Sequence, residues 1–435
     1  MKNLTNGKVL KANLTKISYL VGSIMHGINI FESVLTSPKI FKNRDVLRHS
    51  YTPKYLPHRD EQIKTLASIL APVLSGEIPS NVFIYGKTGT GKTATVKYVT
   101  SMLEEACKKK GVNCLIHYIN CKLIDTHYRV LASIARALGK NVPMTGWPTD
   151  QVYEVVKTAI DKISRTVIII LDEIDKLVKK GDEVLYTLTR INSELEKSKV
   201  SLIGITNDLK VKSFLDPRVL SSLGEEEIVF PPYNADQLKD ILAQRAELAF
   251  YDGVLDEEVI PYCAALAAQE HGDARKALDL LRVSAEIAEK EGSSKVTKEH
   301  VKKAIRKIET DHIVEAVRTL PTQSKVLLLG MIMLKESGKD KFTTGEIYTV
   351  YKSLCKKIGV DVLTQRRISD LISELDTLGI INSVVISKGR YGRTREIKLE
   401  TPIEPIKRTL LEDYRINSLG ITNRNLKNII TIFNF

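Results

Sequence analysis

Eight consecutive residues have the composition of a loop that binds phosphate. They read Gly86-Lys87-Thr88-Gly89-Thr90-Gly91-Lys92-Thr93, which is the pattern GxxxxGK followed by Ser or Thr. Glycines let backbone N–H groups turn inward toward phosphate oxygens. Lys92 is expected to reach the β- and γ-phosphates, and the Thr93 hydroxyl to hold Mg²⁺. The predicted nucleotide-binding residues of this loop are Gly86, Lys87, Thr88, Gly89, Thr90, Gly91, Lys92, Thr93 and Ala94.

Two carboxylates follow a second apolar segment. Val167–Leu171 is uniformly apolar and β-branched, as in a strand buried on both faces, and Asp172 and Glu173 come next. A carboxylate at the tip of a strand beside the phosphate loop can bind Mg²⁺, and the next one can polarise an attacking water. We therefore assign Asp172 to the metal and Glu173 to the general base. The alternative is an ordinary strand end with solvated acids.

A third apolar segment, Val200–Thr206, ends in an amide, Asn207. Such an amide can orient the lytic water or contact the γ-phosphate, although alone it is more often a turn former.

The sequence also predicts the elements that must position these groups. A strand at Asn81–Tyr85 precedes the phosphate loop, and a helix from Ala94 to Leu103 follows it. Ligands of open α/β sheets bind at the carboxyl ends of strands, so the three segments predict one parallel sheet with a site at its edge.

In this order, the motifs resemble those of the AAA+ ATPases. The phosphate loop is similar to Walker A, Ile170–Glu173 to Walker B and Asn207 to sensor 1. The resemblance implies ATP or ADP and Mg²⁺ as cofactors, with hydrolysis of ATP as the reaction.

A predominantly helical stretch follows the turn at Phe230–Tyr233 and continues to about Lys307. Within it, Gly272–Arg282 is similar to the sensor-2 helix of the AAA+ lid domain. From periodicity alone Arg275 is a solvated helix residue. The resemblance instead implies that Arg275 faces the γ-phosphate.

Three further segments are similar to the archaeal replication-initiator family, relatives of the eukaryotic origin recognition complex and its helicase-loading partner. Tyr51–Gln62 occupies the position of the family's initiator box, which packs around the adenine. Asp125–Leu131 lies where the family inserts an extra helix into the ATPase core. Leu215–Ser222 is similar to the segment that carries the arginine finger. The resemblance runs from about Leu47 to about Glu412.

This resemblance implies roles for individual residues. The residues implied around the nucleotide are Tyr55, Leu56, Arg59 and Tyr233. Tyr128 and Arg129 of the inserted helix are implied to lie near the DNA backbone, and Arg218 is the candidate arginine finger.

The carboxy-terminal part has the pattern of a winged helix. Helices are expected at Ser324–Glu336, Gly345–Lys357 and Thr364–Leu378, with Thr364 as N-cap and Gly379 after the last. Strands are expected at Ile380–Ser387 and Glu396–Leu399, around a basic tip, 388–395. The predicted DNA-binding residues are Thr364, Gln365, Arg366 and Arg367 at the start of the third helix, and Lys388, Arg390, Tyr391, Arg393 and Arg395 on the wing. The alternative is a protein-binding winged helix with a solvated wing.

Positive charge is concentrated toward the ends of the chain. Of a net charge of +13, residues 1–50 carry +6, residues 51–320 none, residues 321–400 +5 and residues 401–435 +2. A neutral body with basic ends favours a polyanionic partner.

No apolar run is long enough to span a bilayer, and no membrane partner is expected. The five cysteines form no CxxC pair, which favours a reducing compartment and argues against a zinc site.

The predicted fold is an α/β AAA+ P-loop core with an α-helical lid and a C-terminal winged-helix domain. The expected divisions are a basic N-terminal arm (1–44), the AAA+ core (45–232), the lid (233–315), the winged helix (316–416) and a tail (417–435).

The leading hypothesis is an ATP-dependent replication initiator, cytoplasmic and associated with the nucleoid. It would bind double-stranded origin DNA with the winged helix and the inserted helix, and help to load the replicative helicase, with slow hydrolysis as a switch. Paralogous initiators are further possible partners. One alternative is a DNA-stimulated motor of the helicase or clamp-loader class, which needs a ring and fast turnover. Another is a nucleotide-gated DNA-binding regulator, which a dispensable Glu173 would favour.

Overall fold

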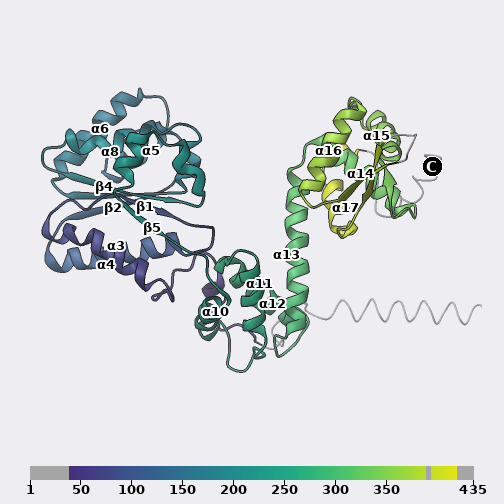
Figure 1. Cartoon of the computed structure of the whole chain (residues 1–435), viewed down its shortest axis with the longest axis horizontal. Helices are drawn as coiled ribbons and strands as arrows, with labels where there is room; N and C mark the ends of the chain where they lie inside the picture. Colours follow the sequence, from purple (N-terminus) through teal and green to yellow (C-terminus); the bar gives the residue numbers. More distant parts are fainter. Residues whose placement is uncertain (1–38, 388–392, 419–435) are drawn as a thin grey trace, which may run out of the picture. The chain divides into compact units, whose positions relative to one another are not determined.

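The computed structural model describes residues 39–387 and 393–418 of the 435-residue chain. The chain divides between Val301 and Lys302 into two compact units (Figure 1). This division lies within α13 (Lys298–Thr319), as does the predicted boundary after residue 315. The predicted tail from residue 419 onward lies outside the described ranges. No helix within those ranges is long and apolar enough to cross a membrane.

The first unit contains a five-stranded parallel sheet, in the order β2-β3-β4-β1-β5. The strands are β1 (Val82–Tyr85), β2 (Cys114–Asn120), β3 (Thr166–Asp172), β4 (Lys199–Thr206) and β5 (Glu226–Val229). The three strands expected from sequence are β1, β3 and β4. Asn120 lies opposite Asp172, and Tyr85 lies opposite Thr206, so the polar residues that end these strands meet at one edge of the sheet.

Helices cover both faces of this sheet. Alternate residues of a strand point to opposite faces, and those of β3 divide accordingly. Ile168 and Ile170 pack with α3 and α4, whereas Val167 and Ile169 pack with α5, α6 and α8. The helices are α3 (Asp60–Leu70), α4 (Lys92–Lys110), α5 (His127–Ala137), α6 (Thr149–Ile163), α7 (Ile174–Val178), α8 (Glu183–Arg190) and α9 (Pro217–Leu223), with 3-10 turns η1 (Arg44–Leu47), η2 (Ala71–Ser75), η3 (Ile191–Ser193) and η4 (Leu209–Phe214). Figure 1 places α3 and α4 below the sheet and α5, α6 and α8 above it.

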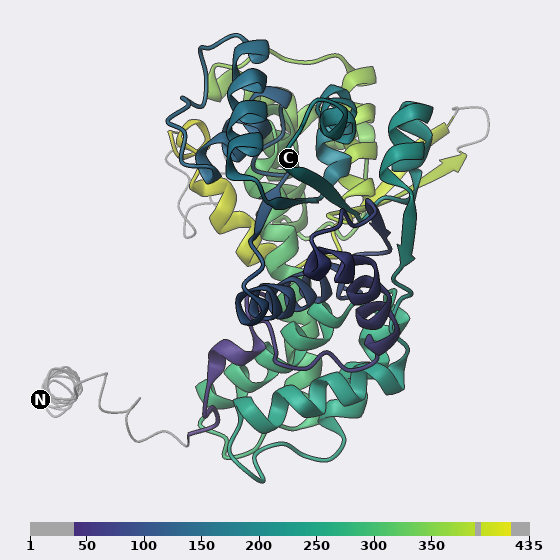
Figure 2. The same ribbon diagram turned by 90° about the vertical axis from the view of Figure 1, so that its left-hand side faces the viewer.

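Three helices form the lid: α10 (Ala235–Ala249), α11 (Val259–Gln269) and α12 (Ala274–Lys290). Asn234 begins α10 with a reciprocal capping box, which fixes where the chain leaves the sheet. The segment before α3 lies against these helices, as the purple chain in Figure 2 shows. Ile40 is fully buried there, and the rings of Phe41 and Phe250 lie 5.2 Å apart. The described end of the predicted N-terminal arm is therefore packed on the lid.

The second unit is a winged helix, as predicted. Its elements are α14 (Thr322–Glu336), β6 (Phe342–Thr343), α15 (Thr344–Ile358), α16 (Gln365–Thr377), β7 (Asn382–Ser387), β8 (Arg393–Lys398), α17 (Ile403–Leu411) and α18 (Tyr414–Asn417). The side chain of Thr364 accepts from the backbone N–H of Arg367, and Gly379 has φ of 69°, so both predicted caps of α16 are confirmed.

The wing differs from the sequence expectation at one point. The basic tip was expected to extend to Arg395, with a strand beginning at Glu396. In the structure, Arg395 pairs with Val385 inside an antiparallel ladder whose strand begins at Arg393. Val384 and Val385 are more than half exposed, so this part of the hairpin lacks the buried alternation that marks a strand in sequence.

A buried ion pair joins two helices of the winged helix. The Lys407 ammonium of α17 donates to the Glu336 carboxylate of α14 at 2.6 Å, and the two side chains are only 4% and 16% exposed. Removing one member of such a pair leaves a buried charge without its partner.

We expect Glu336→Ala to lower the free energy of opening of α14 by about 3 kcal/mol. The double variant Glu336→Ala with Lys407→Met should recover most of that loss, because no charge is then left buried alone. Hydrogen exchange of the α14 amides in the full chain measures both values. Equal destabilisation in the single and double variants would contradict this account.

Candidate active site and nucleic-acid interface

The phosphate loop joins β1 to α4 through positions that require glycine. Gly91 has φ of 89°, and a Cβ there would lie 2.8 Å from the Tyr233 hydroxyl. Gly89 has φ of 73°, and a Cβ there would overlap the carboxylate of Asp273 at the start of α12. The backbone N–H of Ala274 donates to the Gly89 carbonyl at 3.2 Å. The lid therefore contacts the loop directly, which explains a glycine at position 89 that the phosphate-loop pattern does not demand.

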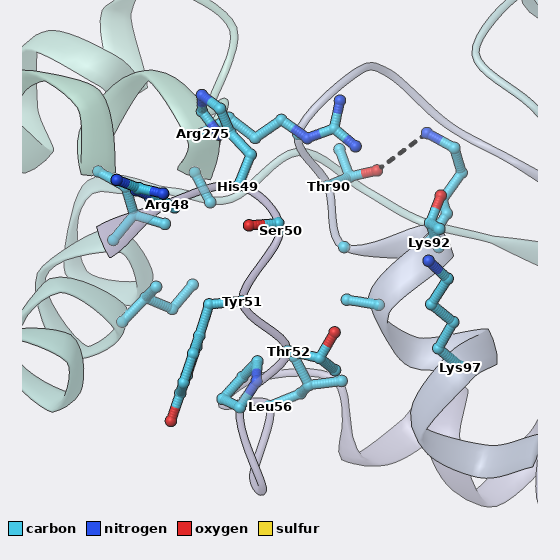
Figure 3. Close-up of a pocket in the computed structure, with 18 of the residues that line it drawn as sticks. Arg48, His49, Ser50, Tyr51, Thr52, Leu56, Thr90, Lys92, Lys97 and Arg275 are labelled. Carbon is cyan, nitrogen blue, oxygen red and sulfur yellow. Dashed lines mark hydrogen bonds between the residues drawn. The ribbon is translucent and has the colours of Figure 1, made fainter. Parts of the chain in front are cut away.

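Lys92 points back toward Thr90 of the loop (Figure 3). Its ammonium donates to the carbonyls of Gly86 and Lys87 at 2.8 and 2.7 Å. Burial lowers the pKa of Lys92 to about 8, while the nearby charge of Asp172 opposes that shift and the charge of Arg275 adds to it. An anion at the loop would stabilise the ammonium and compete with the two carbonyls for its protons.

The carboxylate of Asp172 is held by three donors. Its Oδ2 accepts from the hydroxyls of Thr93 at 2.8 Å and Tyr118 at 2.7 Å. Its Oδ1 accepts from the backbone N–H of Glu173 at 2.9 Å. Burial, and then the bond to Asp172, raise the pKa of Tyr118, so this hydroxyl keeps its proton. The structure thus brings together Thr93 and Asp172, the two predicted metal ligands.

Glu173 follows Asp172 in an unusual backbone conformation. Its φ of 57° is rare for a residue with a Cβ. Glu173 lies between the last residue of β3 and the first residue of α7, so the chain turns at this position. Glu173 and Asn207, at the ends of neighbouring strands, both line the same cavity. Their placement agrees with the sequence expectation that these strand ends converge.

A cavity of about 300 Å³ lies over this edge of the sheet, between the core and the lid. Its wall combines the segment before α3, the phosphate loop, the ends of β2, β3 and β4, and the helices α10 and α12. Figure 3 shows the segment before α3 facing Thr90 and Lys92 of the loop and Arg275 of α12. The predicted nucleotide-site residues that line it are Leu56, Gly89, Thr90, Gly91, Lys92, Thr93, Ala94, Asp172, Glu173, Asn207, Tyr233 and Arg275.

Other predicted nucleotide contacts lie outside the cavity wall. They are Tyr55, Arg59, Gly86, Lys87 and Thr88. Tyr55 is 48% exposed. Arg59 is buried instead beneath the loop, where its Nε donates to the Thr90 carbonyl at 2.9 Å and its guanidinium lies 3.7 Å from the ring centroid of Tyr233.

Several lining residues were not identified from sequence. They include Tyr118 and Asn120 of β2, Lys97 of α4 and Arg245 of α10, as well as 48–50. Residues 51–53 also line the cavity and belong to the initiator-box segment that was expected around the adenine. The strand-end argument could have found Asn120, because Leu115–Ile119 is mostly apolar and ends in that amide. No local pattern marks the others.

The candidate arginine finger, Arg218, does not line this cavity. Its guanidinium is 64% exposed and pairs with the Asp216 carboxylate at 3.0 Å. A finger acts on the nucleotide of a neighbouring subunit, so the role of Arg218 stays a prediction.

The inserted helix α5 carries two predicted DNA contacts. The hydroxyl of Tyr128 donates to the Pro143 carbonyl at 3.0 Å, and its ring packs against the core. Arg129 lies 3.6 Å from the Asp125 carboxylate and keeps 40% of its side chain exposed. Arg129 is thus available at the surface, whereas Tyr128 is bonded within the domain.

The first turn of α16 presents a polar, basic surface. Gln365, Arg366 and Arg367 are all exposed, and Arg367 lies 3.7 Å from Asp370. The exposed Thr364 caps this turn. The four residues predicted to start the recognition helix therefore lie together on one helix end.

The predicted wing contacts are described only in part. Lys388, Arg390 and Tyr391 lie outside the described residues, as does the side chain of Arg393. The guanidinium of Arg395 is bonded within the domain, where it donates to the Ser373 hydroxyl of α16 at 2.5 Å. Arg395 therefore braces the wing strand β8 against α16.

Models of three domains match successive parts of the chain. An AAA ATPase domain matches residues 55–203, a Cdc6 AAA+ ATPase-type lid domain matches residues 239–306, and a CDC6 C-terminal winged helix domain matches residues 315–409. These matches confirm the predicted fold of a P-loop core, a helical lid and a winged helix.

Curated relatives match over nearly their whole length. ORC1-type DNA replication protein 1 of Archaeoglobus fulgidus is 66% identical over 410 residues, which cover 94% of this chain and 100% of that protein. The chain belongs to the ORC1-type DNA replication protein family. The ORC1-type protein of Pyrococcus furiosus is 64% identical over 395 residues, covering 90% of this chain and 94% of that one. The Aeropyrum pernix ORC1 protein, solved in complex with DNA, is 50% identical with a TM-score of 0.74, covering 87% and 99% of the two chains.

This ORC1-type protein is an ATPase, as its motifs predicted and its AAA ATPase domain indicates. The site fits a magnesium nucleotide. Within the described ranges no group of three or more His, Cys, Asp and Glu side chains could hold a metal alone. Mg²⁺ commonly uses one or two protein ligands together with phosphate oxygens and waters, and Thr93 with Asp172 suits that mode. Lys92 and the backbone of the loop face the same cavity.

The lowered pKa of Lys92 predicts proton uptake on nucleotide binding. A lysine whose pKa has fallen from 10.5 to about 8 is mostly neutral near pH ~9, and bound phosphate favours the ammonium. Binding of ADP should take up close to one proton at about pH 9 and little at about pH 7. Calorimetry in two buffers of different ionisation enthalpy measures this difference.

Lys97→Gln is the matched control, because Lys97 lines the same cavity from α4. It should retain the uptake, whereas Lys92→Arg should abolish it. Equal uptake at both pH values would refute the assignment to Lys92.

Proposed function

We propose that this chain is an ATP-dependent initiator of DNA replication that binds duplex origin DNA. The winged helix would read the duplex with the start of α16, and α5 would contact the backbone through Arg129. The observation that carries this proposal is the exposed first turn of α16, with two arginines and a glutamine, in a chain 50% identical to a protein solved with DNA. Arginine pairs with guanine or phosphate and glutamine with adenine, which suits base-edge contact.

The ATPase chemistry follows from the strand ends. Bound Mg²⁺ would supply charge neutralisation at the β- and γ-phosphates, held by Thr93 and by Asp172. Lys92 would neutralise the same oxygens. Glu173 would take a proton from the attacking water as general base, and Asn207 would orient that water. Arg275 extends from α12 into the cavity wall, where it would stabilise charge on the γ-phosphate.

Slow hydrolysis would serve as a switch and not as a motor. In this scheme ATP sets the conformation that recruits the replicative helicase, and paralogous initiators are further partners. The protein would act in the cytoplasm, associated with the nucleoid. Membership of the family supports these assignments. The direct contact of the lid with the phosphate loop supports the switch, because a nucleotide in the loop would act on the lid through that contact.

Glu173→Gln tests the general base. We expect ATP hydrolysis to fall at least about a hundredfold while nucleotide affinity stays within about twofold, because the amide keeps the shape but cannot take a proton. Single-turnover hydrolysis and equilibrium binding measure the two quantities. Glu194→Gln, an exposed glutamate of the same unit, is the control. Unchanged hydrolysis in Glu173→Gln would favour a nucleotide-gated regulator instead.

Arg366→Ala tests the DNA surface. Footprinting with ATP on genomic fragments, including the region beside the gene itself, should show discrete protected sites for the native chain at near-physiological salt. Arg366→Ala should lose protection, at a cost of about 1–3 kcal/mol. Arg408→Ala removes an arginine of α17 that is also exposed and should leave the sites protected. Uniform, salt-labile binding without protected sites would refute origin recognition.

A further inference from the structure

Among the described residues, one hydroxyl from outside the phosphate loop donates a hydrogen bond to the Asp172 carboxylate, and it belongs to Tyr118. It comes from β2, the strand beside β3, and lies two residues before Asn120, which is paired with Asp172. Side chains two residues apart along a strand share a face, so Tyr118 and Asp172 are diagonal neighbours on one face of the sheet. The hydroxyl oxygen lies 2.7 Å from Asp172 Oδ2.

The ring of Tyr118 is fixed from the side of α4. It packs against the apolar cluster between the sheet and this helix, and the Lys97 ammonium lies 4.5 Å from its centroid. A planar ring held on its face leaves the hydroxyl few alternative positions. The bond to Asp172 is therefore directed by packing and by the pairing of β2 with β3.

The donors to Asp172 divide its carboxylate into two unequal oxygens. Oδ2 accepts from both Thr93 and Tyr118, which occupies its two lone pairs. Oδ1 accepts only from the backbone N–H of Glu173, so it keeps one acceptor direction. Only Oδ1 therefore has a lone pair free for a further partner. The three existing hydrogen bonds fix the orientation of the carboxylate, and so the direction in which this lone pair points.

We propose that Tyr118 is a positioning residue for the magnesium site, acting through Asp172. This inference rests on the proposed nucleotide role of the cavity and names a residue that the phosphate-loop and strand-end motifs do not contain. Partners that orient a metal-binding carboxylate typically change metal affinity by 10- to 100-fold when they are removed. Without the Tyr118 hydroxyl, Oδ2 loses one donor and the carboxylate can rotate about its remaining bonds.

The test is a magnesium titration of nucleotide binding in the full chain. A fluorescent, non-hydrolysable ATP analogue is bound first in EDTA and then at increasing Mg²⁺. In EDTA, Tyr118→Phe should bind the analogue within about twofold of the native affinity. The Mg²⁺ concentration that gives half of the increase in analogue affinity should be about tenfold higher in Tyr118→Phe than in the native chain. A general loss of packing would weaken binding in EDTA as well.

Tyr153→Phe is a matched control. Tyr153 also donates to a carboxylate in the same unit, that of Glu194 at 2.9 Å, and does not line the cavity. Both variants lose one hydroxyl bonded to a carboxylate, so they should have similar melting temperatures. Only Tyr118→Phe should shift the magnesium midpoint.

A double-variant cycle shows whether Tyr118 acts through Asp172. In an Asp172→Asn background, Tyr118→Phe should produce no further shift. A native magnesium midpoint in Tyr118→Phe, an equal loss of affinity in EDTA, or a full additional shift in the Asp172→Asn background would each overturn the proposal. If the native chain binds the analogue without any response to Mg²⁺, the proposed magnesium role of Thr93 and Asp172 fails first. If it does not bind the analogue at all, the proposed nucleotide role of the cavity fails.

Discussion

The buried guanidinium of Arg59 joins the parts of the ATPase unit that must stay in register. Its side chain is 2% exposed, and it donates to the carbonyls of Thr90 in the phosphate loop and Pro231 in the turn that leaves the sheet. It also stacks on Tyr233, just before the lid. A buried charge is tolerated only when its donors are satisfied, so these carbonyls cannot move independently. The loop, the turn and the start of the lid are thereby fixed around one side chain.

The chemistry at the sheet edge depends on that fixed frame. Parallel pairing aligns the ends of β2 and β3, which places Tyr118 and Asp172 within hydrogen-bond distance. Thr93, in the first turn of α4, reaches the same carboxylate only because the loop before it is held in place. The two hydrogen bonds of Asp172 Oδ2 thus form only when β2, β3 and α4 hold their relative positions. Small changes in this frame would alter the hydrogen bonds of Asp172 before they altered the fold.

Sequence was sufficient for the parts of the site that local patterns encode. The glycines and Lys92 of the loop, and Asp172 and Glu173 after a fully apolar strand, each follow from residues adjacent in the chain. The resemblance implied Arg59 near the nucleotide, but its bonds to Thr90 and Pro231 did not follow from sequence, and neither did the bond of Tyr118 to Asp172. These partners lie 31 or more residues away, and the bonds depend on pairing between strands and on burial.

The winged helix shows the same limit from another side. Its three main helices and the cap at Thr364 have strong local signals, and they were predicted. The bond of the Arg395 guanidinium to Ser373 of α16 was not predicted, because it joins residues that are 22 positions apart, and the predicted contact of Arg395 with DNA stays a prediction.

The segment before α3 then shows how far such non-local bonds extend: Arg245 donates to the Val46 carbonyl, and His49 lies 2.8 Å from Asp279. A ligand shifts a conformational equilibrium only through contacts that differ between states. Because residues 48–53 line the cavity while bonded to the lid, this segment gives a nucleotide such contacts with both the lid and the core.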